Sequence, residues 1–260
     1  MIAVDAVSVI GFVLSIVFLG YAAYSDLKTR EVSNHLWTIY LPLATVVLIS
    51  RLLLDPKLLV LSVASIAVTT CLSIVMFYIG IFGGADAKAF ICLSVALPTN
   101  PFPLESLFIS LNPIFPLTVL YTTYLLSLST VFLVVIKNLK WKYGERRNLF
   151  KDLPETPTSK RVIALLTGYK TDFRTLQEKV YLYPMEEVSR DSEGHQKKLK
   201  FFTNAEVDRN EAVRNLGDFL TENDKQEVWV TPGIPLLLFT WVALILNAFL
   251  GDILMWIFFH

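Results

Sequence analysis

The chain has 260 residues, of which 54% are hydrophobic and only 18% are charged, and its mean hydropathy is +0.54. A soluble domain carries about 25% charged residues, so this composition excludes an ordinary soluble globular protein. Lys and Arg together number 23, as do Asp and Glu, and this balance gives no sign of a nucleic-acid-binding surface or of an acidic tail.

Apolar stretches along the chain predict its membrane spans. A helix needs about 20 mostly apolar residues to cross roughly 30 Å of hydrocarbon. The first stretch is expected to be a retained span and not a signal peptide, because the residues before it contain Asp5 and no Lys or Arg. The sequence therefore predicts an α-helical polytopic membrane protein with about six transmembrane helices, near residues 6–24, 35–54, 57–81, 86–98, 114–136 and 234–258.

The fourth of these stretches is short. Prolines at 98, 101 and 103 interrupt a helix there, although Phe102 to Leu111 could extend the apolar material beyond them. A short or broken span is tolerated only where neighbouring helices shield its backbone from lipid. We therefore expect the fourth helix to be surrounded by the others.

The distribution of basic residues predicts the orientation in the membrane. Eighteen of the 23 Lys and Arg residues fall between Lys137 and Lys225, and the short loops that would share their side of the membrane hold Lys28, Arg30 and Lys88. Basic residues favour the cytoplasmic side. We expect these segments to be cytoplasmic in a multi-pass plasma-membrane protein with both termini outside.

The long polar segment divides the chain into membrane helices 1–5 over residues 1–136, a cytoplasmic soluble insertion over 137–229 and a sixth membrane helix over 230–260. Within the insertion, apolar spacing predicts a helix at Ser159–Thr167 and a second, amphipathic helix within 204–225. Alternating patterns predict three strands and one turn, which makes the insertion a small α+β module: strands Glu178–Tyr183, Lys198–Thr203 and Glu227–Val230, and turn Arg190–Gly194.

Two aspartates at span ends form the strongest candidate catalytic site. Asp26 follows the first span and Asp86 precedes the fourth, so the predicted topology brings both to one membrane face. Two carboxyl groups at one desolvated site cannot both ionise easily and so share a proton. The ionised group can take a proton from water that attacks a peptide carbonyl, while the protonated group binds the carbonyl oxygen and later supplies a proton to the leaving amine.

Each aspartate also has a structural explanation. Asp26 could be an ordinary polar residue at a helix end, and Asp86 could cap the helix that follows it. The residues before Asp86 favour the catalytic reading, because Gly83, Gly84 and Ala85 would let an extended or positive-φ backbone approach a substrate closely. A helix cap does not require three small residues.

The segments around the two aspartates resemble the prepilin peptidase family, and within it the archaeal preflagellin (prearchaellin) peptidases, which are GxGD membrane aspartyl proteases like presenilin and signal peptide peptidase. The family's first motif is matched at Asp26, Lys28, Arg30, Val32 and Asn34. Its G-x-G-D-x-K motif is matched at Gly83, Gly84, Asp86 and Lys88, while Ala85 replaces the second glycine. The stretches Trp229–Pro235 and Gly251–Asp252 also resemble the archaeal members.

This resemblance implies that Asp26 and Asp86 are catalytic, that Lys88 and the region of Pro235 support substrate binding, and that the substrates are preflagellin-like or prepilin-like precursors. Such precursors carry a short basic leader ahead of an apolar helix, and cleavage would occur at the cytoplasmic face. Lys88 could instead extend to the lipid headgroups. Pro235 could simply begin the last helix, since Pro is favoured in a first helical turn.

The chain lacks the signatures of other enzyme classes. It has neither an H-E-x-x-H zinc motif nor a C-x-x-C pair, with Cys71 and Cys92 far apart, so we expect no metal and no cofactor. The bacterial members of the family that the chain resembles often add a methyltransferase activity with a cysteine-rich zinc loop, and without such a loop we expect peptidase activity alone. Three alternatives stay open: a presenilin-like protease that cuts within membrane helices, a transporter or proton pathway, and a non-catalytic assembly protein. A transporter would be expected to carry carboxylates near the middle of several spans, and an assembly protein would tolerate Asn in place of Asp26 and Asp86.

Overall fold

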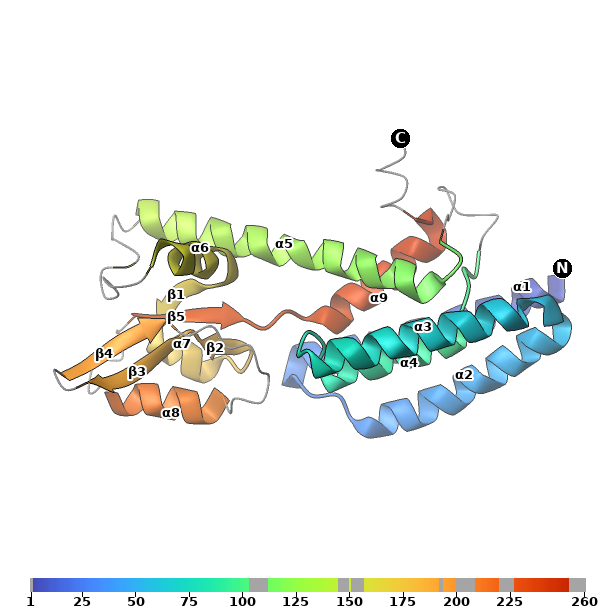
Figure 1. The fold of residues 1–260 in the computed structure, drawn as a ribbon, viewed down its shortest axis with the longest axis horizontal. Coiled ribbons are helices and arrows are strands. Elements are labelled where there is room, and N and C mark those ends of the chain that lie inside the picture. The colour runs from blue at the N-terminus through green and yellow to red at the C-terminus, as the bar shows by residue number, and fades with distance from the viewer. Residues whose placement is uncertain are drawn as a thin grey trace. The chain divides into compact units, whose positions relative to one another are not determined.

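A computed structural model describes residues 2–102, 112–144, 150, 157–191, 194–199, 209–219 and 227–252. The chain forms two compact units (Figure 1): unit 1 comprises Met1–Ser127 with Pro235–His260, and unit 2 comprises Leu128–Ile234. This division differs slightly from the predicted one, because the last turns of the fifth helix belong with the inserted module. The predictions for 103–111, 200–208 and 253–260 lie outside the described residues.

Unit 1 is a bundle of apolar helices, as the composition predicts. Its described elements are α1 (Ile2–Thr29), α2 (Asn34–Leu54), a 3₁₀ turn η1 (Pro56–Leu58), α3 (Leu59–Tyr78), α4 (Gly84–Ala96), the first part of α5 (Phe115–Gly144) and α9 (Leu236–Leu250). In the described part of the chain, 4 helices are long and apolar enough to span a membrane: Ala6–Thr29, Asn34–Leu54, Pro56–Tyr78 and Phe115–Tyr143.

The protein is therefore a polytopic α-helical membrane protein. Each of the six predicted spans coincides with a helix, but α4 has 13 residues and α9 has 15, which is shorter than a full crossing. The count of six transmembrane helices thus stays a prediction.

Helix α4 is short because its ends are fixed by the sequence. Gly80, with φ 81°, ends the turn after α3, and Pro98 follows directly after the C-cap Leu97. Eight of its residues are buried: Ala87, Ala89, Phe90, Cys92, Leu93, Ser94, Val95 and Ala96. It packs against α1, α2, α3 and α9, which supplies the shielding that a short helix in a membrane requires.

Three contacts establish which ends of the helices lie together. The Tyr40 hydroxyl of α2 donates to Ser15 Oγ of α1 at 2.8 Å. Helix α9 is antiparallel to α1. At one end the Phe12 ring meets the Phe249 ring edge to face, with the two centroids 5.6 Å apart, and nearer the other end Trp241 Nε1 donates to Ile16 O at 3.0 Å. The C-terminal end of α1 and the N-terminal end of α9 therefore share one end of the bundle.

Unit 2 is the small α+β module. It contains the last turns of α5 and a three-stranded antiparallel sheet of order β1-β5-β2, in which Tyr169 pairs with Val230 and Leu182 with Pro232. A separate hairpin pairs β3 with β4. Its described elements are α6 (Thr158–Thr167), β1 (Tyr169–Asp172), α7 (Phe173–Glu178), β2 (Leu182–Pro184), β3 (Glu186–Asp191), β4 (Gly194–Leu199), α8 (Arg209–Phe219) and β5 (Glu227–Pro232).

The structure bears out some local predictions for this module and corrects others. Helix α6, helix α8 and strand β5 lie where the sequence places two helices and the last strand. The strand expected at Glu178–Tyr183 is wrong, because the strand begins only at Leu182 after helix α7. Phe173 and Leu176, at helical spacing, are buried in α7, and Arg209 donates from a distant helix to the carbonyl oxygens of Leu176 and Lys179 at its end.

Strands β1 and β3 were not predicted. The strand expected at Lys198–Thr203 begins earlier, because β4 starts at Gly194, and the expected residues beyond Leu199 lie outside the described part of the chain. Short strands of mixed polarity such as Tyr169–Asp172 carry too little alternation to be recognised without knowledge of their partner strand.

Candidate functional site

Asp26 lies in the last turn of α1. The preceding turn buries Ala22 and Ala23 in the bundle core, so the Asp26 side chain, 18% exposed, points from a packed face into a partly desolvated setting. Arg30 Nη1 lies 3.8 Å from Asp26 Oδ2. The Arg30 amide also donates to Asp26 O at 3.0 Å, and this i to i+4 bond closes the helix.

Arg30 itself has φ 59°, the left-handed conformation that ends many helices and normally favours Gly. Neighbouring hydroxyl groups fasten the chain as it turns toward α2. Ser25 Oγ donates to Glu31 O at 2.8 Å, and Thr29 Oγ1 lies 3.0 Å from the same carbonyl oxygen. The turn that carries Arg30 is therefore held by side chains of the α1 end.

Asp86 is the third residue of α4, and its Oδ2 accepts from the backbone N–H of Gly83 at 3.0 Å. The structural explanation for this aspartate is thus present in the molecule, although the N-cap position belongs to Gly83 and not to Asp86. Gly83 has φ −72° and ψ 162°, an extended conformation that needs no positive φ. Of the three small residues, only Gly83 is extended, since Gly84 and Ala85 already belong to α4 and none of the three has a positive φ. Their close approach to a substrate stays a prediction.

Gly83 nevertheless has little room for a side chain. A Cβ placed on Gly83 would lie 3.1 Å from Asp86 Oδ2, closer than most such contacts, whereas a Cβ on Gly84 would lie 3.8 Å from the Phe77 ring. Ala85, which replaces the second glycine of the family motif, packs against the bundle core. Space is therefore tight at position 83, and alanine is accommodated at 85.

The structure brings the two aspartate segments together. Asp26 and Asp86 lie close enough for their carboxyl groups to interact electrostatically. The two segments are also joined by a direct hydrogen bond, in which Lys88 Nζ donates to Asn34 Oδ1 at 2.7 Å. Lys88 comes from the start of α4 and Asn34 from the start of α2, so the lysine has a protein partner although its side chain is exposed. Its extension to the headgroups stays a prediction.

An aromatic stack that was not predicted from the sequence supports Asp86. The Phe82 ring lies parallel to Phe90, with centroids 5.4 Å apart, and to Tyr124 of α5 at 6.2 Å. Tyr124 Oη lies 3.8 Å from Met76 Sδ, and this tyrosine also interacts electrostatically with Asp86. The stack fixes the residue that precedes Gly83. Its sequence signal is too weak to find, since isolated aromatic residues are common in apolar helices.

Pro235 is the N-cap residue of α9 and accepts backbone hydrogen bonds from Leu238 and Phe239. The antiparallel packing of α9 on α1 places it at the same end of the bundle as Asp26. Its contacts explain it as a helix start. A role in substrate binding therefore stays a prediction.

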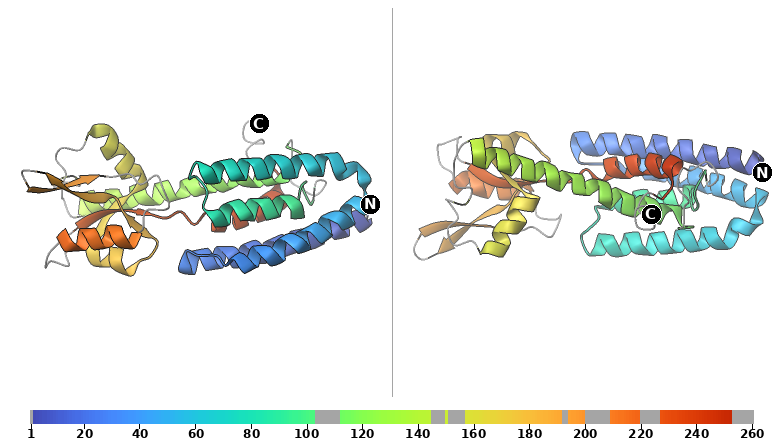
Figure 2. Two further views of the ribbon diagram at one scale, coloured as in Figure 1. Left: turned by 60° about the horizontal axis from the view of Figure 1, so that its bottom comes forward. Right: turned by 90° about the horizontal axis from the view of Figure 1, so that it is seen from above.

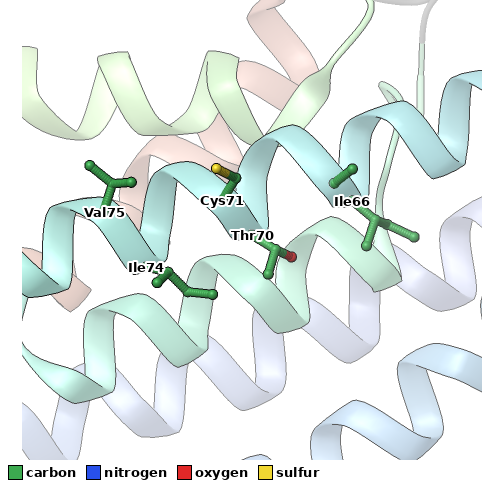
Figure 3. A pocket seen from close by; sticks show the side chains of 6 residues that line it. Ile66, Thr70, Cys71, Ile74 and Val75 are labelled. Atoms are coloured by element: carbon green, nitrogen blue, oxygen red, sulfur yellow. The ribbon is translucent and has the colours of Figure 1, made fainter.

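One groove on the described part of unit 1 lies away from the two aspartates (Figure 3). It has a volume of ≈ 470 Å³ and is lined on α3 by Ile66, Ala67, Thr70, Cys71, Ile74 and Val75. Its lining is mostly aliphatic, with one hydroxyl and one thiol, and the groove includes neither aspartate. Among the residues that the structure describes, no three His, Cys, Asp or Glu side chains are grouped as a metal ion would require.

Comparison with known proteins agrees with the two motif segments. Residues 13–136 match the model of the type IV leader peptidase family, and residues 160–253 match that of the archaeal peptidase A24 C-terminus, type II. Similar curated proteins include the preflagellin peptidase of Methanococcus voltae, 27% identical over 256 residues, which cover 94% of this chain and 96% of that protein.

The preflagellin peptidases of Methanococcus maripaludis and Methanocaldococcus jannaschii are each 24% identical, over 250 and 256 residues respectively. These alignments cover 94% and 96% of this chain, and 96% and 97% of the two proteins. The similarity thus includes the membrane helices and the inserted module alike. The chain is a membrane peptidase that belongs to the type IV leader peptidase family.

Proposed function

We propose that the protein is an aspartyl endopeptidase that removes the short basic leader from preflagellin-like or prepilin-like precursors at the cytoplasmic face of the membrane. The observation that carries this proposal is the meeting of the two aspartate segments at one end of the bundle. The charge of Asp26 acts on Asp86, and the Lys88–Asn34 hydrogen bond joins the helices that flank them. The family match and the names of the similar proteins support the same activity.

In the proposed reaction, one carboxyl group is ionised and the other is protonated, because two adjacent charges in a poorly solvated site repel each other. The ionised carboxylate accepts a proton from water as the water oxygen attacks the scissile carbonyl carbon. The protonated carboxyl group donates a hydrogen bond to the carbonyl oxygen. Collapse of the tetrahedral intermediate breaks the C–N bond, and a carboxyl proton is transferred to the leaving amine.

The backbone before Asp86 is suited to a peptide substrate. Gly83 is extended, Gly84 begins α4 and both are exposed, so neither residue has a side chain that would separate its main chain from an approaching peptide. Only the small size of these residues allows main chain to approach main chain beside a carboxylate. Ala85 and Lys88 follow within the next turn, and we assign them supporting roles together with Pro235.

The cytoplasmic location of the site rests on the distribution of basic residues. A leader with its own basic residues is retained on that side of the membrane by the same rule. The cleavage point between leader and apolar helix would then lie at the membrane surface, where the ends of α1 and α4 carry the two aspartates.

Cleavage of a purified preflagellin-like substrate by the reconstituted protein tests the proposal. The wild type, Asp26→Asn and Asp86→Asn proteins are compared by gel shift, with and without a chelator. Metal-independent cleavage that either substitution abolishes is the expected result. If both variants still cleave, the assignment of the two aspartates is wrong. If the folded wild type cleaves only within apolar helices, a presenilin-like activity replaces leader removal, and if it cleaves nothing, transport or assembly becomes the better explanation.

A further inference from the structure

One face of helix α6 in unit 2 is both apolar and exposed. Val162, Ile163 and Leu166 are 50%, 46% and 43% exposed, and their spacing places them on one side of the helix. The other side is packed, since Ala164 is fully buried in a cluster with Met185, Leu199 and Trp229. Lys160 is exposed at the edge of the apolar face. A short helix with this pattern is typical of a segment that lies in a membrane surface.

Helix α6 is fastened at a defined level of α5. Asn138 of α5 is buried, and its Nδ2 donates to Leu165 O at 2.9 Å and to Gly168 O at 2.7 Å. These two bonds hold the C-terminal end of α6 against the α5 helix. Both views of Figure 2, with Figure 1, show α6 running crosswise to α5. A helix crosswise to a transmembrane helix lies along the membrane plane.

The part of α5 around Asn138 has the residue pattern of a helix at the membrane boundary. An exposed apolar stripe runs along this part of the helix at Leu128, Phe132, Ile136, Leu139 and Tyr143. Exposed lysines appear only in its last turns, at Lys137, Lys140 and Lys142. Lysine stems reach from apolar surface to headgroups, and tyrosine is enriched at the membrane interface. Asn138 therefore attaches α6 where the apolar helix leaves the hydrocarbon.

We propose that α6 is an interfacial helix that inserts Val162, Ile163 and Leu166 into a membrane surface containing anionic lipid. Lys140, Lys142 and Lys160 face the headgroups in this arrangement. Lipid is favoured over a protein partner for two reasons: the exposed apolar surface of α6 occurs at the level where the stripe of α5 meets lipid, and the charges beside it are basic. This inference does not depend on the catalytic assignment.

The test places a fluorescent label at the apolar face in vesicles. Ile163→Cys carries the label in a Cys71→Ala background, because Cys71 is exposed on α3, and the background without Ile163→Cys serves as the labelling blank. Gln177→Cys, at an exposed position of α7, is the matched control. Quenching by iodide in water is compared with quenching by nitroxide near the lipid headgroups, in zwitterionic vesicles and in vesicles with anionic lipid.

The expected result is at least threefold weaker iodide quenching at position 163 than at 177, together with strong quenching by the lipid nitroxide that increases with anionic lipid. A combined Lys140→Gln, Lys142→Gln and Lys160→Gln variant should lose that increase.

Equal iodide quenching at both positions would overturn the proposal, since the face would be in water. Protection from both quenchers would also overturn it, because a second copy or another protein would then cover the helix. Equal lipid quenching with and without anionic lipid would overturn the assignment to anionic headgroups.

Discussion

The two aspartate segments hold their carboxyl groups in different ways. Asp86 accepts a hydrogen bond from the backbone of Gly83 at 3.0 Å, at the start of a buried helix and next to a stack of three aromatic rings. Asp26 lies at the end of a helix, and its closest charged partner is the Arg30 side chain at 3.8 Å. A backbone donor cannot rotate away, whereas an arginine side chain at that distance can. The comparison suggests that Asp86 is the fixed member of the pair and Asp26 the adjustable one.

If the fixed and the adjustable aspartate act as one pair, replacing either carboxyl group should abolish cleavage. We expect Asp26→Asn, Asp86→Asn and the double variant to lose cleavage to the same background, by about 10³-fold or more, because residues that act as a unit have non-additive effects. Cleavage of a precursor is measured by gel shift. Asn at position 86 can still accept the Gly83 N–H bond, so thermal unfolding should change little. A double variant much slower than both single variants would show that the aspartates act separately.

The fixed position of Asp86 is tested at the glycine that contacts it. In Gly83→Ala the new Cβ would lie 3.1 Å from Asp86 Oδ2 and displace the carboxyl group. The carboxyl group would have to move by a few tenths of an ångström. Because misplacing a catalytic group by about 1 Å can cost about 10²-fold in rate, we expect a smaller loss of about 10-fold in kcat. Gly84→Ala is the matched control, with its Cβ 3.8 Å from Phe77. Equal losses in the two variants would show that the effect is not one of space at Asp86.

The link between the segments is tested at Lys88 and Asn34. Lys88→Met and Asn34→Ala each remove the 2.7 Å hydrogen bond, and we expect each to reduce kcat/KM by about 3- to 10-fold. The double variant should be no slower than the worse single variant, because contacting residues couple by about 1 kcal/mol. The three variants and the wild type form a double-mutant cycle for cleavage. Additive losses would mean that the hydrogen bond does not couple the segments.

The smallest effect is expected at Arg30, which has φ 59°. Arg30→Gly and Arg30→Ala both remove the partner of Asp26, so both should reduce cleavage by a similar small factor of about 2- to 5-fold. Only glycine adopts the left-handed conformation without strain, and we expect Arg30→Gly to be more stable than Arg30→Ala by about 1 kcal/mol. Thermal unfolding followed by tryptophan fluorescence measures the difference. Equal stability would contradict the conformational argument.

Hydropathy and motif spacing were sufficient to predict much of this molecule. Apolar length predicts the helices of unit 1, because a membrane span is determined by local composition and needs no knowledge of its partners. The aspartates were found through Gly83 and the residues around Asp26, where an unusual local pattern marks each segment. The pairing of Lys88 with Asn34 and the stacking of Phe82 on Tyr124 were not foreseen, since each depends on how distant helices pack.

The inserted module was harder to predict for the same reason. Its helix α7 is completed by Arg209, which lies far along the chain and donates to the carbonyl oxygens at the end of that helix. Strand β1 exists as a strand because it pairs with β5. Local sequence therefore predicts elements with their own periodic pattern, such as α6 and α8, and misses those that depend on a remote partner.

The packing of α9 on α1 has a consequence for the order in which the protein is made. The contacts that hold the two aspartate segments come from Arg30, Asn34, Gly83 and Lys88, all within the part of the chain that ends with α4. Helix α9 is synthesised much later, yet Trp241 occupies the space beside Gly20, where a Cβ would lie 2.9 Å from its Nε1. A nascent chain therefore exposes this site on α1 to lipid or to other helices until the ribosome has completed the inserted module.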